Sequence, residues 1–356
     1  MKTKITFILF SLVISVTFLF AQTDGPYVWR TPDSVIVKAI VHGKLQEDRF
    51  ANNQIDDHPV SIIFADHPDW NFSVRLRNEI QNENPISAGS SKMIFISDIE
   101  GEFENVRNFL LANKIMNKNY QWTFGKNKLI ICGDLFDRGK HVTEELWLLY
   151  KLEDEARSAG GYVHTILGNH EIMNLSGDVR YVDSAYFRSA AVIGTAYANL
   201  YSDSTELGRW LRSKNIVEKI GEHLCLHGGI SPAFNRERLP VEQINALARP
   251  WYARARDKNA DPVTRLLMGA GGPFWYRGYF VAPLATQEQV DSVVHFYACK
   301  NLIVGHDIVE TITTRYNGKV FGIDVNEHEH HTEGLLVKTK KYYRIDLSGR
   351  KKKLQP

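Results

Sequence analysis

Five short polar clusters, each at the end of an apolar run, constrain the fold of this 356-residue chain more than any other feature. The apolar runs are short and rich in β-branched residues, as is typical of strands that are covered on both faces of a sheet. The predicted strands are Met93–Ser97, Leu129–Cys132, Val163–Leu167, His223–Leu226 and Leu302–Val304. The clusters that follow them are Asp98-Ile99-Glu100-Gly101, Gly133-Asp134-Leu135-Phe136-Asp137-Arg138-Gly139, Gly168-Asn169-His170-Glu171, His227-Gly228-Gly229 and Gly305-His306-Asp307. Ligand sites of layered α/β proteins gather on loops at the carboxyl ends of strands, so we expect the clusters to converge.

Helical periodicity follows the first two clusters. Apolar residues recur at helical spacing from Phe103 to Leu110 and again from Val142 to Tyr150. The repeated order of strand, loop and helix implies parallel crossover connections. The main part of the chain is therefore predicted to have an α/β fold.

The first 21 residues have the outline of a secretory signal. Two lysines precede an uncharged stretch from Ile5 to Phe20, and the segment ends at Ala21. This pattern predicts a signal peptide over residues 1–21 and export to the periplasm or out of the cell. The alternative is an uncleaved membrane anchor, because Leu19 is large for a position two before a cleavage site. Contact with a membrane is expected only in that case.

The rest of the chain divides into an N-terminal extension, a main domain and a tail. Residues 22–91 contain β-rich runs followed by a polar linker, so we expect a β-rich extension that packs on the main domain. The main domain is predicted over residues 92–347. Within it, helical periodicity in the insertion at 172–222 favours a helical cap over the site, with a helix pair packed elsewhere as the alternative. Residues 348–356 are predicted to be a basic, solvated tail.

Charge and cysteine content exclude two broad classes of protein. Lysine and arginine total 43, aspartate and glutamate total 41, and two of the lysines lie in the predicted signal. The mature chain is therefore formally neutral, which argues against a general nucleic-acid binder. The three cysteines are too few and too scattered for a disulfide framework.

The residue types in the clusters suit the binding of two cations. Carboxylates, an amide oxygen and imidazoles are ligands for divalent metals. Asp134 could bridge two ions, with oxygens from Asp98 and Glu100 on one side. On the other side, the ligands would be Asn169, His227 and His306. A phosphate ester resists hydroxide because its oxygens are already negative, so two cations placed against those oxygens would favour its hydrolysis.

The set of clusters resembles the calcineurin-like metallophosphoesterases, and within them the phosphoprotein phosphatases. That family's pattern is D-x-H-G, G-D-x-x-D-R-G, G-N-H-E, H-G-G and a late His, and the last four parts are matched here. The similarity spans about Lys92 to Val337. The segment Trp275-Tyr276-Arg277-Gly278 is similar to the Shewanella-like branch of these phosphatases. The resemblance implies a metallophosphoesterase-type layered β-sandwich flanked by helices.

The resemblance also implies roles for individual residues. Asp134 would bridge the metals, with Asp98 at the first ion, and Asn169, His227 and His306 at the second. His170 would protonate the leaving oxygen, and Asp137 would orient that imidazole. Arg138 and Arg277 would contact the phosphoryl oxygens, for which the planar guanidinium is suited, and Asn169 would also contact the substrate.

One position departs from the family pattern, because the histidine of the first cluster is Glu100 here. The position two after His306, where many relatives that do not act on proteins have a second histidine, is Ile308. The first metal site is then expected to have oxygen ligands only, which favours Mn or Mg over softer ions. We therefore predict two divalent ions, with Mn preferred and Mg, Fe or Zn as alternatives.

The function predicted from these residues is that of an exported phosphatase. It would hydrolyse phosphomonoesters, of a protein or of a small molecule, by a dinuclear-metal hydroxide mechanism. One alternative within enzymes is a phosphodiesterase or a nucleotide pyrophosphohydrolase, because the same two-metal core serves both. The other alternative is a non-catalytic phosphoryl-binding module, suggested by Glu100 but opposed by His170, since binding alone needs no proton donor.

Overall fold

The structure, a computed structural model, describes residues 22–254, 257–325 and 331–355. The predicted signal peptide at 1–21 lies outside these residues. Within the described ranges, none of the helices combines the length and the apolar character needed to cross a membrane.

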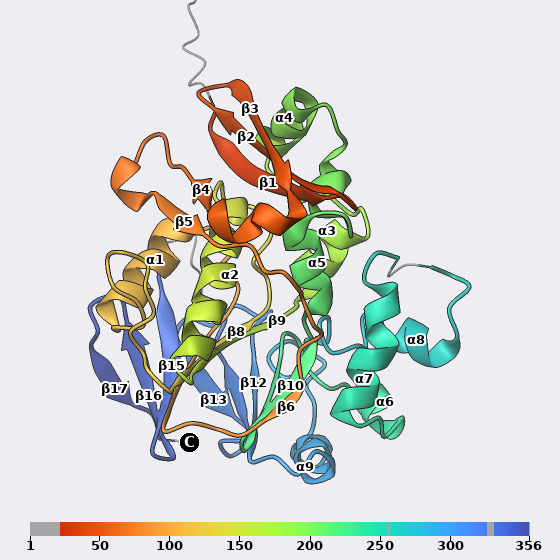
Figure 1. The fold of residues 1–356 in the computed structure, drawn as a ribbon. Coiled ribbons are helices and arrows are strands. Elements are labelled where there is room, and N and C mark those ends of the chain that lie inside the picture. Colours follow the sequence, from red (N-terminus) through yellow and green to blue (C-terminus); the bar gives the residue numbers. More distant parts are fainter. Residues whose placement is uncertain (1–21, 255–256, 326–330, 356) are drawn as a thin grey trace, which may run out of the picture.

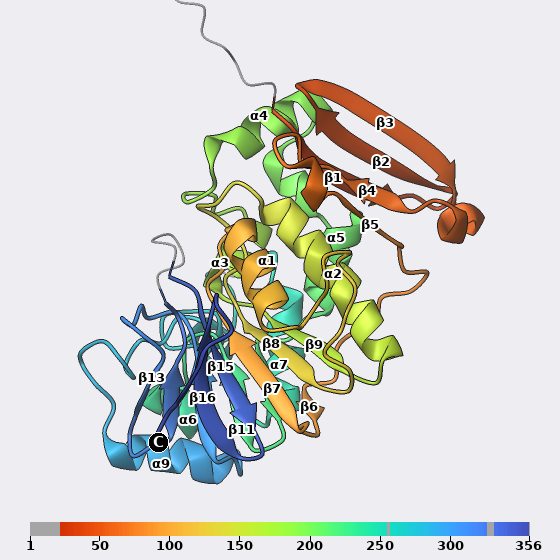
Figure 2. The same cartoon turned by 90° about the vertical axis from the view of Figure 1, so that its left-hand side faces the viewer.

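Two six-stranded sheets form the centre of the main domain (Figure 2). The first has the strand order β17-β16-β15-β7-β8-β9, and the second has the order β13-β14-β12-β11-β10-β6. The strands of the first sheet are β7 (Lys92–Ile96), β8 (Lys128–Cys132), β9 (Tyr162–Ile166), β15 (Glu333–Lys338), β16 (Lys341–Asp346) and β17 (Lys351–Lys353). Those of the second are β6 (Ile86–Ser87), β10 (Val217–Ile220), β11 (His223–Leu226), β12 (Asn301–Val304), β13 (Thr313–Arg315) and β14 (Val320–Gly322).

The alternation of side chains along the strands explains why the two sheets pack face to face. Met93 and Phe95 of β7 join a core shared with strands of the second sheet, whereas Ile94 and Ile96 join the core under the helices. Because successive side chains of a strand point to opposite faces, both faces of β7 are buried. The layered β-sandwich flanked by helices that the sequence predicted is therefore confirmed.

Parallel pairing brings the carboxyl ends of the site strands to one edge of each sheet. β7, β8 and β9 pair in parallel, as do β11, β12 and β14. The helices lie outside the sheets, with α2 beside β9 and α7 beside β10. The α-helices are α1 (Phe103–Ala112), α2 (Val142–Ser158), α3 (Asn169–Leu175), α4 (Ser184–Ile193), α5 (Glu206–Ser213), α6 (Pro232–Arg236), α7 (Val241–Ala248), α8 (Pro262–Leu267) and α9 (Gln287–Phe296). The 3-10 helices are η1 (Asn52–Asp57), η2 (Pro68–Trp70), η3 (Tyr197–Tyr201) and η4 (Arg249–Trp251).

The N-terminal extension is a separate small sheet that covers helices of the main domain. It consists of β1 (Asp24–Arg30), β2 (Ser34–Val41) and β3 (Lys44–Ala51), followed by the pair β4 (Val60–Ile62) and β5 (Phe72–Val74). This sheet lies against α2, α4 and α5 at the top of Figure 1. The indole of Trp147 on α2 donates a hydrogen bond of 2.8 Å to the carbonyl of Pro26. The contact joins the extension to the main domain.

The segment 172–222, which we predicted to be a helical cap, contains α4, η3 and α5 and then β10 of the second sheet. Its helices α4 and α5 contact the N-terminal sheet. The described residues that line the cavity at the site include none from 172–222. The tail also differs in detail from the prediction, because the side chains of Lys351–Lys353 are exposed but their backbone pairs with β16.

Candidate metal centre

The first three clusters form one network at the ends of β7, β8 and β9. The backbone N–H of Asp98 donates to the carbonyl of Gly133 at 3.0 Å, and that of Glu100 donates to the carbonyl of Asp134 at 3.1 Å. Asp98, Glu100 and Asp134 have φ values of 55°, 49° and 56°, in the left-handed region that non-glycine residues rarely adopt. Such strained residues persist where the surrounding structure fixes them, and they cluster at functional sites.

Three predicted ligands surround the imidazole of a fourth, His227. Its Nε2 lies 2.9 Å from Oδ2 of Asp134, 3.0 Å from Oδ1 of Asn169 and 3.1 Å from Nδ1 of His306. Its Nδ1 lies 2.8 Å from the carbonyl of Cys132, which favours a proton on that nitrogen. Nε2 is then the atom available to a metal, as in many metal-binding histidines.

The other two predicted ligands, Glu100 and Asp98, also lie close to Asp134 or to the histidines. Ligand atoms of Glu100, Asp134 and His170 lie within 4.8 Å of one another. Oδ1 of Asp98 is 3.9 Å from Nε2 of His227, and its Oδ2 accepts a hydrogen bond of 3.1 Å from the backbone of His306. The structure thus brings together all six residues predicted as metal ligands.

The donor set and its electrostatics fit a pair of cations. Nε2 of His306 is buried and has no hydrogen-bond partner of normal geometry among the described residues. Burial and repulsion from Asp134 raise the pKa of Asp98 to about 6, although His227 opposes this shift. Burial and the neighbouring His227 lower the pKa of His306 to about 2, so this imidazole is neutral at neutral pH. Burial disfavours the ionised form of such carboxylates. A divalent ion bound beside them and the neutral imidazole would stabilise that ionised form.

Asp134 and His227 have the opposite electrostatic environment. Burial lowers the pKa of His227, but Asp134 and Asp98 outweigh burial and raise it to about 10. Burial alone would raise the pKa of Asp134, but His227 and His170 outweigh burial and lower the pKa of this carboxyl. Asp134 is therefore ionised at neutral pH, and a metal would have to displace the proton from Nε2 of His227.

His170 belongs to a chain of side chains that orients its ring. Its Nδ1 lies 2.6 Å from Oδ2 of Asp137, and Oδ1 of Asp137 accepts a hydrogen bond of 2.9 Å from Asn174. The amide oxygen of Asn174 accepts a bond of 2.7 Å from the hydroxyl of Tyr197. Burial lowers the pKa of His170, but Asp134 and Asp137 outweigh it and the net shift is upwards. Nε2, directed towards Glu100 and Asp134 at 3.8 Å, is thus favoured to carry a proton into the site.

Glu171 is a site residue to which the sequence analysis gave no role. Its Oε2 accepts backbone hydrogen bonds from Gly168 at 2.6 Å and Asp134 at 3.0 Å. Its Oε1 accepts from Leu135 at 2.7 Å and Phe136 at 3.2 Å. One buried carboxylate therefore fixes the second cluster to the third. The signal was its place in the G-N-H-E cluster, one position after His170.

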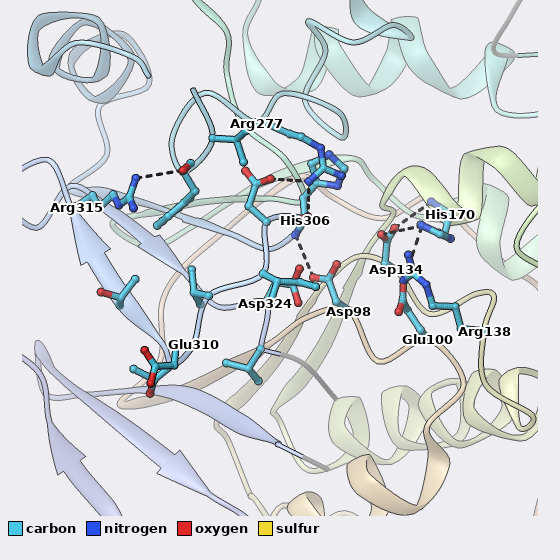
Figure 3. A pocket seen from close by; sticks show the side chains of 18 residues that line it. Asp98, Glu100, Asp134, Arg138, His170, Arg277, His306, Glu310, Arg315 and Asp324 are labelled. Atoms are coloured by element: carbon cyan, nitrogen blue, oxygen red, sulfur yellow. Dashed lines mark hydrogen bonds and ion pairs between the residues drawn. The ribbon is translucent and has the colours of Figure 1, made fainter. Parts of the chain in front are cut away.

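The two predicted phosphate-binding arginines have carboxylate partners in the site (Figure 3). Arg138 pairs with Glu100, and its guanidinium lies over the ring of Tyr181. Arg277 pairs with Asp307 at 2.6 Å and donates to the carbonyl of His306 at 3.1 Å. Both side chains are nearly half exposed and line a cavity of about 720 Å³ that also includes Asp98, Asp134 and His170.

Asp324, at the end of β14, is a further carboxylate of this cavity that the sequence analysis missed. Burial, followed by repulsion from Asp98, raises the pKa of Asp324 well above its ordinary value. Its only sequence signal was an acidic residue directly after an apolar strand. No pattern in the sequence distinguished Asp324 from an acidic residue at the end of any other strand.

The comparisons with known proteins agree with this geometry. Residues 91–310 match the family model described as calcineurin-like phosphoesterase. The chain is similar to the crystal structure of a cold-active protein-tyrosine phosphatase of a psychrophilic Shewanella species, with 32% identity, a TM-score of 0.86, and coverage of 94% of this chain and 100% of that one.

Two curated relatives show the same similarity. Shewanella-like protein phosphatase 2 of Arabidopsis thaliana is 25% identical, over 68% of this chain and 73% of its own length. Shewanella-like protein phosphatase 1 of Plasmodium berghei is 30% identical, over 61% of each chain.

Proposed function

This chain belongs to the calcineurin-like phosphoesterase family and is a phosphoric ester hydrolase, and on that premise we propose that it is a dinuclear-metal phosphatase that hydrolyses phosphomonoesters. The observation that carries the proposal is the geometry of one cavity. Its wall combines the metal ligands Asp98 and Asp134, the proton donor His170 and the guanidinium groups of Arg138 and Arg277. A binding module would have no use for the His170–Asp137 pair.

Members of this family depend on two metal ions, and the residues of this site fit them. We propose that Asp98, Glu100 and Asp134 hold the first ion, and that Asp134, Asn169, His227 and His306 hold the second. When bound, the ions would supply positive charge against the phosphoryl oxygens and a nucleophile activated at neutral pH. Because the first set consists of carboxylates, we propose Mn as the preferred metal there.

The protein's own groups would then perform the remaining steps. Nε2 of His170 would donate its proton to the departing oxygen, while Asp137 and Asn174 keep the ring in the required orientation. Arg138 and Arg277 would contact the non-bridging phosphoryl oxygens. Two guanidinium groups on one cavity wall match the dianionic charge of a monoester better than the single charge of a diester.

Phosphotyrosine is a substrate that the similarity supports. The Shewanella structure that covers 94% of this chain is that of a protein-tyrosine phosphatase. We also propose export to the periplasm or out of the cell, which the lysines and uncharged stretch of residues 1–21 support. N-terminal sequencing of the protein recovered from the periplasm or medium tests this second proposal, because cytoplasmic protein that begins at Met1 would contradict it.

The experiment that tests the function is an activity matrix of metals against substrates. Purified protein is assayed with Mn, Mg, Fe or Zn on an aryl phosphomonoester, its matched diester and a phosphotyrosyl peptide. We expect the monoester and the peptide to be hydrolysed best with Mn, and His170→Asn to lose that activity. His295→Asn, which changes an exposed histidine on α9, serves as the matched control. Faster hydrolysis of the diester would support the phosphodiesterase alternative, and metal binding without any turnover would contradict the proposal.

A further inference from the structure

The cavity extends beyond the metal ligands to a second part with different chemistry. Arg138 and His170 lie at one end of the view in Figure 3, and Arg315 lies at the opposite end, with Arg277 and His306 between them. Phe280 lies against Arg315, and the aliphatic side chains of Val281 and Ile308 line the same cavity. Val281 and Ile308 are 46% and 69% exposed. We call the part lined by Phe280, Val281, Ile308 and Arg315 the distal subsite.

The guanidinium of Arg315 has a defined position in this subsite. Arg315 is the last residue of β13, and its guanidinium lies 4.8 Å from the centre of the Phe280 ring. Its Nη1 donates hydrogen bonds of 3.3 Å to the carbonyls of Tyr279 and Phe280. A guanidinium has five N–H donors, so donors remain for a ligand after these bonds are made. A cation that is already oriented loses less entropy when it binds an anion.

Phe280 is itself positioned by the adjacent strand. A Cβ atom on Gly322 of β14 would come within 2.5 Å of the Phe280 ring. The absence of a side chain at position 322 therefore permits the ring to lie directly on β14, which pairs with β13. Phe280 thus lies between β14 and the guanidinium of Arg315, and the position of Arg315 follows from the fold of the sheet rather than from a flexible loop.

Arg315 differs from the other two arginines of the cavity in its charge environment. Arg138 and Arg277 pair with Glu100 and Asp307. Within the part of the chain that the structure describes, no carboxylate lies within ion-pair distance of Arg315, whose bonding partners are neutral carbonyls. Glu310 is an exposed carboxylate on the wall of the same cavity, and it would oppose the binding of an anion.

We infer that the distal subsite binds a carboxylate of a phosphopeptide substrate, from an Asp or Glu close to the phosphorylated residue, while the phosphoryl group occupies the metal centre. This inference rests on the proposed function and names its substrate class. The phosphoryl group is directed to the other end of the cavity by the metal ligands and Arg138. The remaining cation at Arg315 faces an aliphatic and aromatic wall, which suits a peptide chain with an acidic side chain better than a small hydrophilic phosphate.

The test uses pairs of phosphotyrosyl peptides that differ only by Glu or Gln at one position, from three before to three after the phosphotyrosine. The full protein with Mn is compared with Arg315→Gln, Glu310→Gln and the control Arg350→Gln, an exposed arginine on the turn before β17. The readout is the ratio of kcat/KM for the Glu and Gln peptides, with kcat and KM determined separately. An aryl phosphate without any second anion measures the basal activity of each variant.

We expect the unmodified protein to prefer one Glu peptide by about 3- to 10-fold, through KM, which is the range of a single ion pair in a partly solvated pocket. Arg315→Gln should abolish this preference and leave hydrolysis of the aryl phosphate within twofold. Glu310→Gln should increase the preference, and Arg350→Gln should not change it.

Three results would overturn the inference. The first is an equal rate on all Glu and Gln peptides by an otherwise active enzyme. The second is a loss of aryl phosphate hydrolysis in Arg315→Gln as large as the loss on peptides, which would make Arg315 a support of the metal centre. The third is an Arg315-dependent preference for a small bisphosphate with none for any acidic peptide. Failure of the proposed function is a different result, because the unmodified protein would then hydrolyse no monoester.

Discussion

Gly168 provides a test of the metal centre that changes no charge and no ligand. A Cβ atom at this position would lie 2.7 Å from the backbone nitrogen of Asp134 and 2.9 Å from Cγ of His227, and it would come still closer to Oδ1 of Asp134. The backbone of Gly168 has φ −95° and ψ −168°, a conformation open to any residue. The effect of Gly168→Ala is therefore steric and falls on the carboxylate of Asp134.

The size of the effect follows from these distances. Ordinary van der Waals contact of a Cβ begins at 3.4 Å, so the Asp134 backbone would have to move by about 0.7 Å. Overpacking of this kind costs about 1–3 kcal/mol of the free energy of unfolding. A misplacement of about 1 Å at a reacting centre can cost about 100-fold in rate, so we expect kcat to fall roughly 30- to 100-fold.

The assay compares Gly168→Ala with Gly89→Ala. At Gly89, a Cβ would have its nearest neighbours at 3.6 Å or beyond, which is ordinary contact. For each variant, kcat on an aryl phosphate, the metal affinity by calorimetry and the free energy of unfolding in urea are measured. Gly168→Ala should show weaker metal binding together with the lower kcat, and Gly89→Ala should match the unmodified protein. A folded Gly168→Ala with kcat within twofold and unchanged metal affinity would refute the placement of Asp134.

Three further predictions concern the proton donor, the N-terminal sheet and the first metal position. His170→Asn should lower kcat by about 10²- to 10⁴-fold on alkyl phosphates and much less on aryl phosphates with acidic leaving groups, while calorimetry shows metal binding intact. Burial and the charge of Glu144 raise the pKa of Asp24 from 3.8 to about 7, so the stability that its protonated form contributes is complete below pH 4 and is lost as the pH rises through 7. The free energy of unfolding that is lost between these two pH values is roughly 4 kcal/mol. Asp24→Asn should therefore reduce the difference in urea stability between pH 5 and pH 8, and an unchanged difference would contradict the assignment. Glu100→His should increase the iron or zinc retained after purification without added metal, as measured by elemental analysis, and an unaltered metal content would count against Glu100 as a ligand.

The sheet strands and the convergence of the polar clusters were predictable because both follow from local patterns. The run from Met93 to Ile96 is apolar throughout, and its alternate side chains fill the two different cores found in the structure. A strand buried on both faces must be followed by a loop at a sheet edge, and parallel pairing places such loops together. Parallel pairing accounts for the proximity of Asp98, Asp134 and Asn169 within one sheet, whereas His227 follows β11 of the other sheet. Its position beside Asp134 was predicted only through the family resemblance of the clusters.

The partners of the predicted residues were less accessible to sequence reasoning. Asn174 and Tyr197 orient Asp137, yet an Asn four positions after His170 and a Tyr in a helical insertion have many other uses. The contacts of α4 and α5 with the N-terminal sheet depend on which apolar faces meet. Hydrophobic periodicity indicates that a helix has an apolar face, but it does not identify the surface that packs against that face.

The charges of the cavity connect metal binding with substrate binding. Among the residues that the structure describes, six carboxylates line it, from Asp98, Glu100, Asp134, Asp307, Glu310 and Asp324, against three arginines. If all are ionised, the formal charge is −3, and a phosphate dianion would be repelled. Two divalent ions would change this charge to +1, so we expect the ions to be needed for the substrate to bind and not only for its hydrolysis. Glu100 in place of histidine lowers the charge by one, which makes this dependence stronger here than in a relative with an imidazole. Arg138, paired with Glu100, becomes available to a phosphoryl group only when a cation competes for that carboxylate.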